Sequence, residues 1–169
     1  MPTIGVSIPV PDPYGCALQD FRVSLGDESA QHIPTHITLV PPTEVPELSL
    51  GDIEAHLSEA ASRQEPFRVR LRGTGTFRPV SPVVFVGVVE GIAGCEVLAA
   101  AARSGPLAVE ISFPYHPHVT VAHDLPDERL DVAFAELADY EADFEVDEFW
   151  LYMHDDRHGW RPTKAFQLG

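Results

Sequence analysis

The sequence predicts an α+β fold in which antiparallel β-sheets line a central groove and helices lie outside. Two observations predict it. Segments with strand-like and helix-like apolar periods alternate along the chain, and several strands follow one another through short connections, as between residues 72 and 83. Short connections join antiparallel strands, whereas parallel strands need long crossovers, so a doubly wound parallel sheet is disfavoured. The 169 residues fit one domain, 1–169, built of two interlocked lobes.

Apolar periods and prolines define the elements of the first half of the chain. β-Branched and apolar runs indicate strands, and apolar residues three and four positions apart indicate helices. Pro41 and Pro42 are expected to end the second strand, because proline cannot donate to a β-ladder. In the third strand the alternation puts Val69 on one face and Arg70 on the other. The predicted order is strand, helix, strand, helix, strand, at residues 3–10, 14–25, 33–40, 49–63 and 67–71.

A similar order returns in the second half. Its first strand is a nearly unbroken apolar run, as expected of a central strand. The alanine-rich helix that follows is ended by Gly105 and Pro106. The predicted elements are a strand at 83–89, a helix at 92–103, a strand at 118–122, a helix at 127–140, a strand at 144–153, a turn at 155–159 and a closing strand at 160–168.

The charge of the chain limits its partners. Its formal net charge is −15, which repels a long nucleic acid unless basic residues gather in one place. We therefore expect a small nucleotide or one RNA end as the ligand, and no duplex nucleic acid. No apolar run approaches the roughly 20 residues of a membrane span. The start of the chain has no basic region and no apolar signal core, so we expect a cytoplasmic protein with no membrane partner. We also expect a monomer.

Two tetrads of the form His-apolar-Thr-apolar lie on predicted strands. They are His36-Ile37-Thr38-Leu39 and His118-Val119-Thr120-Val121, and the second follows the first by 82 residues, about half the chain. Because side chains alternate along a strand, the histidine and threonine of each tetrad share one face. The apolar pair of each tetrad then anchors the strand into the core. The matched spacing indicates an internal duplication that brings both polar pairs to one groove.

Two opposed imidazoles and two hydroxyls suit phosphodiester chemistry. Cleavage of a P–O bond needs a base that activates the nucleophile and an acid that protonates the departing oxygen, and imidazole serves in either role near neutral pH. The threonine hydroxyls can donate hydrogen bonds to the non-bridging oxygens. This chemistry requires no metal and no cofactor. One such tetrad is also what an ordinary strand would show by chance, whereas a matched pair is much rarer.

The tetrads resemble the paired signature of the two-histidine phosphoesterase superfamily, particularly its bacterial "2′-5′ RNA ligase" (LigT-like) branch. Residues 36–42, His-Ile-Thr-Leu-Val-Pro-Pro, are similar to the first motif with its proline exit, and residues 117–122, Pro-His-Val-Thr-Val-Ala, to the second. The resemblance covers nearly the whole chain. It implies a bilobal α+β fold and action on 2′,3′-cyclic phosphates or 2′-5′ linkages. It also implies His36 and His118 as the acid–base pair, with Thr38 and Thr120 binding the phosphate.

Further residues are candidates for binding the substrate. Many LigT-like members carry an arginine shortly after the second tetrad, where this chain has His123, and a neutral imidazole would hold a phosphate more weakly. His116 is expected on the face of His118, and Arg70 could attract phosphate or only balance acidic neighbours. Aromatic residues near the C-terminus could stack on a base, although core packing is the expected role of the first of them: Phe149, Trp150, Tyr152 and Trp160.

Three alternatives stay open at this point. His32, His36, His116 and His118 could form a metal site, although no carboxylate lies at matching spacing. The chain could be a non-catalytic sensor of nucleotides or RNA ends, although binding alone needs no opposed acid and base. It could also be a structural or interaction module, if the tetrads were buried and far apart.

Overall fold

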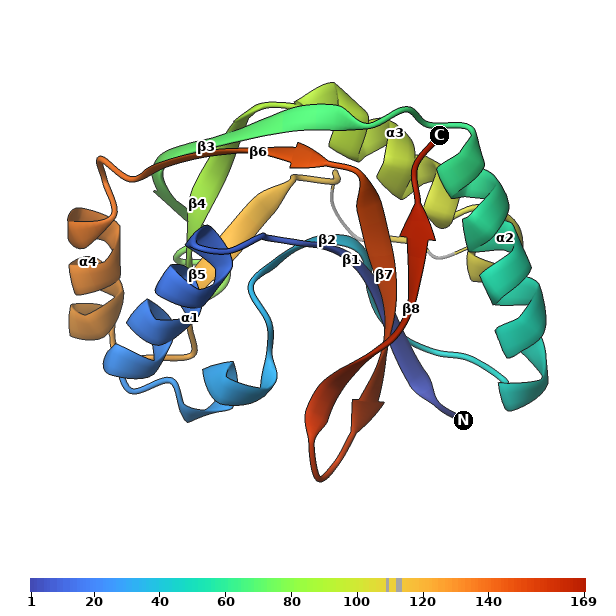
Figure 1. Ribbon diagram of the computed structural model, residues 1–169. Coiled ribbons are helices and arrows are strands. Elements are labelled where there is room, and N and C mark those ends of the chain that lie inside the picture. The colour runs from blue at the N-terminus through green and yellow to red at the C-terminus, as the bar shows by residue number, and fades with distance from the viewer. Residues whose placement is uncertain (109, 112–113) are drawn as a thin grey trace.

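The computed structural model describes residues 1–108, 110–111 and 114–169. Within them the chain forms four α-helices, three short 3-10 helices and eight strands (Figure 1). The elements are β1 (Thr3–Pro9), α1 (Tyr14–Ser24), η1 (Glu28–His32), β2 (His36–Glu44), η2 (Glu47–Ser49), α2 (Leu50–Ser62), β3 (Phe67–Thr76), β4 (Val83–Glu90), α3 (Ile92–Ala102), η3 (Gly105–Leu107), β5 (His118–His123), α4 (Asp127–Glu136), β6 (Glu141–Val146), β7 (Glu148–Asp155) and β8 (Gly159–Gln167).

All eight strands belong to one curled sheet, in the order β6-β3-β4-β5-β2-β1-β7-β8 (Figure 1). Every pair of neighbouring strands is antiparallel. The predicted α+β class with antiparallel strands is therefore confirmed. The sheet is continuous through its centre, where β2 of one half pairs with β5 of the other.

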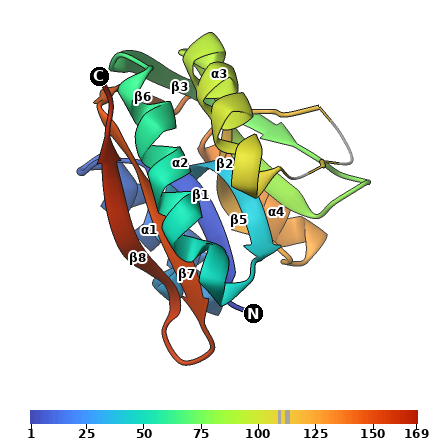
Figure 2. The same ribbon diagram turned by 90° about the vertical axis from the view of Figure 1, so that its right-hand side faces the viewer.

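The sheet has two halves that exchange elements. We call β1, β2, β7 and β8 the first lobe, and β3 to β6 the second lobe. Helix α1, which connects β1 to β2, packs against β5, and helix α3, which connects β4 to β5, packs against β2. Helices α2 and α3 lie side by side (Figure 2), and α4 covers strands of the second lobe. Thus the helix that connects two strands of one lobe packs against a strand of the other lobe, and this holds for both lobes.

Strand β2 is longer than the sequence predicted. It continues through Pro41 and Pro42 to Glu44. The two prolines fall at a register shift between β1 and β2, where neither is among the paired residues. Because the ladder needs no N–H group from them there, the prolines do not end the strand.

The predicted single strand at residues 144–153 is wrong. The structure breaks it at Asp147 into β6, which pairs with β3, and β7, which pairs with β1. The chain crosses from the second lobe to the first at this point. The helix expected at residues 127–140 ends earlier, at Glu136, because Tyr140 already accepts a hydrogen bond from the Gly73 backbone and leads into β6.

The core lies between the sheet and the helices. The apolar side chains of both tetrads are fully buried in it, together with Phe149, whose expected core role is confirmed. Among the described residues no helix has the length and apolar character needed to cross a membrane.

Candidate active site

The two tetrads lie on neighbouring strands at the centre of the sheet. Ile37 of β2 pairs with Val119 of β5 in antiparallel register. Continuing that register by one residue each way puts His36 opposite Thr120 and Thr38 opposite His118. Ile37, Leu39, Val119 and Val121 each have an exposed fraction of 0%, whereas the four polar side chains are partly exposed. The polar side chains therefore share the open face of the sheet, opposite the helices.

The two lobes repeat the same local geometry around the tetrads. In the first lobe Ser7 pairs with Thr38 and Val6 with Val40, so one extra residue of β2 bulges out between them. In the second lobe Phe85 pairs with Thr120 and Val84 with Ala122, with the same single-residue shift. The bulges fall at equivalent positions, immediately after each threonine. This matched irregularity supports the duplication that the spacing of the tetrads indicated.

Both histidine rings are held in one orientation by the backbone. Nδ1 of His36 lies 2.6 Å from the carbonyl oxygen of Pro34, and Nδ1 of His118 lies 2.6 Å from that of His116. A carbonyl oxygen can only accept, so each Nδ1 carries the proton. In the neutral ring Nε2 is then the acceptor. Each histidine can therefore take or give a proton at Nε2.

The surroundings favour the neutral form of both rings. Burial lowers the pKa of His36 from its ordinary value of 6.5; the hydrogen bond to Pro34 opposes this shift, and the Arg22 guanidinium adds to it. Burial also lowers the pKa of His118, and the nearby imidazoles of His116 and His36 lower it further. The pairing of Ile37 with Val119 puts the two imidazoles on neighbouring strands, in keeping with the small contribution of His36 to the lowered pKa of His118.

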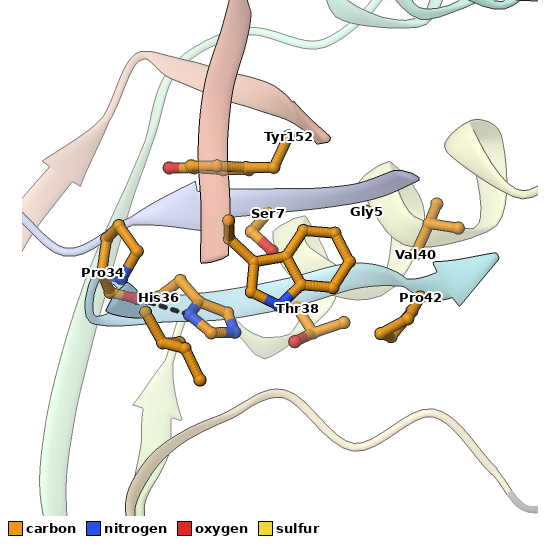
Figure 3. A pocket seen from close by; sticks show the side chains of 10 residues that line it. Gly5, Ser7, Pro34, His36, Thr38, Val40, Pro42 and Tyr152 are labelled. Atoms are coloured by element: carbon orange, nitrogen blue, oxygen red, sulfur yellow. Dashed lines mark hydrogen bonds between the residues drawn. The ribbon is translucent and has the colours of Figure 1, made fainter. Parts of the chain in front are cut away.

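A cavity opens beside the first tetrad (Figure 3). In Figure 3 the side chains of His36 and Thr38 rise from β2, Ser7 from β1 and Tyr152 from β7. Trp160 of β8 closes another side, so two of the predicted stacking residues do line a cavity with His36. The full lining is Gly5, Ser7, Ile33, Pro34, His36, Thr38, Val40, Pro42, Tyr152 and Trp160.

The second tetrad is surrounded by aromatic rings instead. The ring centroids of Phe77 and Phe85 lie 5.0 Å and 5.2 Å from that of His118. His116 joins the same cluster, with its ring 5.5 Å from that of His118. The sequence placed His116 on the face of His118, and the structure brings the two rings together. Whether His116 contacts substrate stays a prediction.

The other predicted binding residues lie further out. The bulge after Thr120 returns His123 to the open face, where its Nε2 lies 3.4 Å from the Asp124 carboxylate. Arg70 forms ion pairs with Glu90 at 3.7 Å and with Glu141 at 3.3 Å. It does not line the cavity beside His36. A role in binding stays a prediction for both residues.

The alternative metal site finds no support in the geometry. Within the described part of the chain, no three His, Cys, Asp or Glu side chains lie close enough together to hold an ion. His32, His36, His116 and His118 are therefore not a preformed ligand set.

Sequence reasoning missed three contributors to the site. Gly5 and Ser7 of β1 line the cavity, and Tyr115 donates a hydrogen bond from its hydroxyl to the Thr38 carbonyl oxygen at 2.7 Å. Small residues in an apolar strand carry no chemical signal. Only the pairing of β1 with β2 reveals that Ser7 lies next to Thr38.

Known proteins share both sequence and fold with this chain. A family model described as the 2′-5′ RNA ligase superfamily matches residues 10–158. A Bacillus cytotoxicus protein that carries a provisional phosphoesterase name is 30% identical over 139 residues, which cover 81% of this chain and 80% of that protein. A protein of Oceanobacillus iheyensis with the same provisional name is 30% identical over 144 residues, covering 81% of each.

Solved structures agree in the arrangement of the whole chain. E. coli LigT in complex with NADP+ superposes with a TM-score of 0.70 at 21% identity, covering 99% of this chain and 97% of that one. E. coli LigT in complex with 3′-AMP gives a TM-score of 0.66 at 24% identity, covering 99% of both. A Thermus thermophilus protein gives 0.68 at 24% identity, covering 99% and 98%. At these identities the likeness shows the fold.

Proposed function

The chain belongs to the 2′-5′ RNA ligase superfamily, and we propose that it is a metal-independent phosphodiesterase acting on 2′,3′-cyclic phosphates or 2′-5′ linkages of nucleotides and RNA ends. Its relatives support a phosphoesterase. One observation supports the proposal most strongly. Two histidines on adjacent strands present the same ring nitrogen, Nε2, because each Nδ1 is bound to a carbonyl oxygen two residues earlier.

The proposed reaction opens a cyclic phosphate with water. One histidine accepts a proton from water at Nε2, and the water oxygen forms a bond to phosphorus. The bond from phosphorus to one ribose oxygen breaks, and the other histidine gives that oxygen a proton from its Nε2. The products are a ribose hydroxyl and a phosphate monoester. The two histidines end with their protonation states exchanged, and proton transfer through solvent restores them.

The two threonines are proposed to stabilise the phosphate as charge builds on its non-bridging oxygens. Thr38 and Thr120 lie on the same face as the histidines. Within the described part of the chain neither hydroxyl has a hydrogen-bond partner, so each can donate to a phosphate oxygen. Removal of one such donor costs about 10²- to 10³-fold in kcat in other enzymes.

We infer the class of substrate from the relatives of this chain. E. coli LigT has been solved with 3′-AMP, with ATP and with NADP+, which supports a small nucleotide as the ligand here. The net charge of −15 argues in the same direction, because a long polyanion would be repelled.

The proposal is tested with substrates and two variants. The protein is incubated with EDTA and with 2′,3′-cyclic nucleotides, oligonucleotides that end in a cyclic phosphate, and 2′-5′ linked dinucleotides. We expect turnover in EDTA, and a loss of about 10²- to 10⁴-fold in His36→Ala and in His118→Ala. His56→Ala is the matched control, because His56 binds the Ala101 carbonyl between α2 and α3.

Three results would contradict the proposal. Turnover that EDTA abolishes would make the enzyme metal-dependent. Turnover that survives in both histidine variants would place the chemistry elsewhere. Binding of nucleotides by the intact protein without any turnover would identify a sensor instead of an enzyme. Circular dichroism of each variant separates loss of chemistry from loss of fold.

A further inference from the structure

We propose that the cavity beside His36 is the nucleoside site and that the enzyme selects a mononucleoside cyclic phosphate with a single negative charge over substrates that carry additional phosphates. This inference rests on the proposed phosphodiesterase function and narrows its substrate. Three features of the described residues carry it: an exchange of large and small side chains between the lobes, an acidic hollow next to the cavity, and the pairing of most cations with carboxylates.

Equivalent positions in the two lobes carry side chains of opposite size. Ser7 pairs with Thr38 in the first lobe, and Phe85 pairs with Thr120 in the second. On its other side, Ser7 of β1 is paired with Trp150 of β7, and Phe85 of β4 is paired with Gly75 of β3. A Cβ atom on Gly75 would lie 2.5 Å from the Phe85 ring, so that ring already fills the space above Gly75.

The consequence of this exchange is a one-sided site. Beside His36 the small Ser7 leaves a cavity. Beside His118 the ring of Phe85 packs in a tilted arrangement against that of Phe77, with 4.7 Å between their centroids, and Phe85 is only 9% exposed. The bulky part of a substrate therefore fits on the His36 side, with its phosphate between the two tetrads.

The cavity suits a flat, uncharged ring. Among its described lining residues there is no lysine, arginine or carboxylate. The Trp160 ring lies over Gly5 and against His154: its atoms are 3.4 Å and 3.7 Å from where a Cβ of Gly5 would stand, and its centroid is 5.2 Å from that of His154. This indole and Tyr152 line the same cavity and offer a stacking surface for any nucleobase.

The space next to the cavity disfavours further phosphates. A second hollow shares Pro34 and Tyr152 with the cavity. Four carboxylates line it, and none of its described lining residues is a lysine or arginine. A nucleotide chain or pyrophosphate that extended from the nucleoside in this direction would meet like charge at short range. These carboxylates are Asp12, Glu145, Asp147 and Glu148.

Most cations of the chain are already compensated. The chain has 11 lysines and arginines. Seven of the arginines lie within 4.0 Å of a carboxylate oxygen, which leaves few to bind a second or third phosphate group. These seven are Arg22, Arg63, Arg68, Arg70, Arg72, Arg78 and Arg161.

The selectivity is measured with three substrates that share the reacting group. They are adenosine 2′,3′-cyclic phosphate, the same compound with a 5′-phosphate, and a dinucleotide that ends in the cyclic phosphate. We expect kcat/KM to fall by about tenfold or more with the added phosphate, and the difference to shrink at high salt because screening weakens repulsion. Equal or higher kcat/KM for the extended substrates at low salt would overturn the inference.

The stacking surface is tested with Trp160→Ala and Trp160→Phe. We expect Trp160→Ala to raise KM for the cyclic nucleotide about 10- to 100-fold, and Trp160→Phe to recover most of the loss. The comparison substrate is a sugar that carries the same five-membered cyclic phosphate but no base. The kcat/KM for this substrate should be equal in the intact protein and in Trp160→Ala. A parallel loss for both substrates would mean that Trp160 acts on the reacting groups and not on the base.

The acidic hollow is tested by neutralising Glu145→Gln, Asp147→Asn and Glu148→Gln together. We expect the ratio of kcat/KM for extended over simple substrate to rise about fivefold or more. The matched control removes the same charge on the helix side of the molecule, from η2 and α2, by Glu47→Gln, Asp52→Asn and Glu54→Gln. This control should leave the ratio of kcat/KM values unchanged. An unchanged ratio in the first variant would overturn the role of the hollow. Absence of all turnover would overturn the proposed function itself, which separates the two failures.

Discussion

The hydroxyl of Tyr115 donates a hydrogen bond at 2.7 Å to the backbone carbonyl oxygen of Thr38. Tyr115 stands three residues before His118, so the segment that leads into the second tetrad is tied to the strand of the first. The Arg103 guanidinium lies 5.4 Å from the centre of the Tyr115 ring and adds a cation–π contact. The relative position of the two tetrads thus depends on a bond outside the β2–β5 ladder, in which Ile37 and Val119 are the paired residues.

Tyr115→Phe is expected to lower the free energy of unfolding by about 1 kcal/mol, because the Thr38 carbonyl loses its donor. Urea denaturation measures this loss. Tyr140→Phe is the matched control: within the described part of the chain the buried Tyr140 hydroxyl has no hydrogen-bond partner, so its removal should leave stability unchanged or raise it. Equal losses in both variants would show that the bond to Thr38 contributes nothing specific.

The pH dependence of catalysis follows from the lowered pKa values of the two histidines. Activity needs one neutral and one protonated ring, so kcat/KM falls below the lower pKa and above the higher one. Both pKa values lie below 6.5 in the free protein, so kcat/KM should already decline as pH rises past 6.5. A bound phosphate anion raises both pKa values, which should move the maximum of kcat to higher pH. Profiles of both parameters from acidic to alkaline pH test this, and a kcat/KM maximum well above neutrality would contradict it.

Gly159→Ala is expected to destabilise the β7–β8 hairpin and disturb the cavity. Gly159 has a φ of 70°, and a Cβ there would lie 2.5 Å from Cβ of His32. Gly26→Ala is the matched control, because Gly26 has a φ of 95° with no atom within 4 Å of an added Cβ. The control should cost about 1–2 kcal/mol through the backbone alone. Gly159→Ala should cost about 1–3 kcal/mol more through the collision and should also raise KM. Equal free energies of unfolding would contradict the contact with His32.

The one-sided cavity also predicts which histidine protonates the leaving oxygen. If the nucleoside lies beside His36, the departing ribose oxygen is on that side and His36 is the acid, with His118 activating water. A cyclic substrate with sulfur in place of the leaving oxygen needs no acid, because a thiolate departs unprotonated. On it, His36→Ala should recover most of its lost rate, and His118→Ala should not. The opposite pattern would exchange the two roles.

Arg70→Gln tests whether this arginine contributes to binding. Its ion pairs with Glu90 and Glu141 compensate its charge, so we expect KM for a simple cyclic nucleotide to change by less than about twofold. Lys164→Gln on β8 is the control for the same change in net charge. A several-fold rise in KM for Arg70→Gln alone would support the role in binding that the sequence suggested.

The sequence predicted the fold class and the face of each tetrad correctly, because both depend on local alternation. The prediction joined β6 and β7 into one strand because both segments are rich in apolar residues. In the structure Ala142, Phe144 and Val146 are buried at even positions, whereas Phe149 and Leu151 are buried at odd ones. In the sequence this change is hidden, because residues 149–153 are an unbroken run of apolar and aromatic residues. A change of phase within a strand pattern indicates that the pairing partner changes.

The cavity could be predicted only in part. Tyr152 and Trp160 were candidates because aromatic residues stack on bases, but their position beside His36 depends on which strands pair across the sheet. Gly5 and Ser7 became recognisable only through that pairing. Long-range register is not encoded in the spacing of residues along one strand, and this is why the one-sided site was not predicted.

The crossing of the chain at Asp147 has a consequence for synthesis on the ribosome. Strand β1 is made long before its outer partner β7, which starts only at Glu148. Until that stretch leaves the exit tunnel, one edge of β1 has no partner and remains open to other nascent chains. The docking of β7 must therefore follow synthesis of the chain through Asp155, and the large sequence separation of β7 from β1 makes this docking a slow step. A protein released before residue 148 would keep both tetrads but lack the two strands that complete the first lobe.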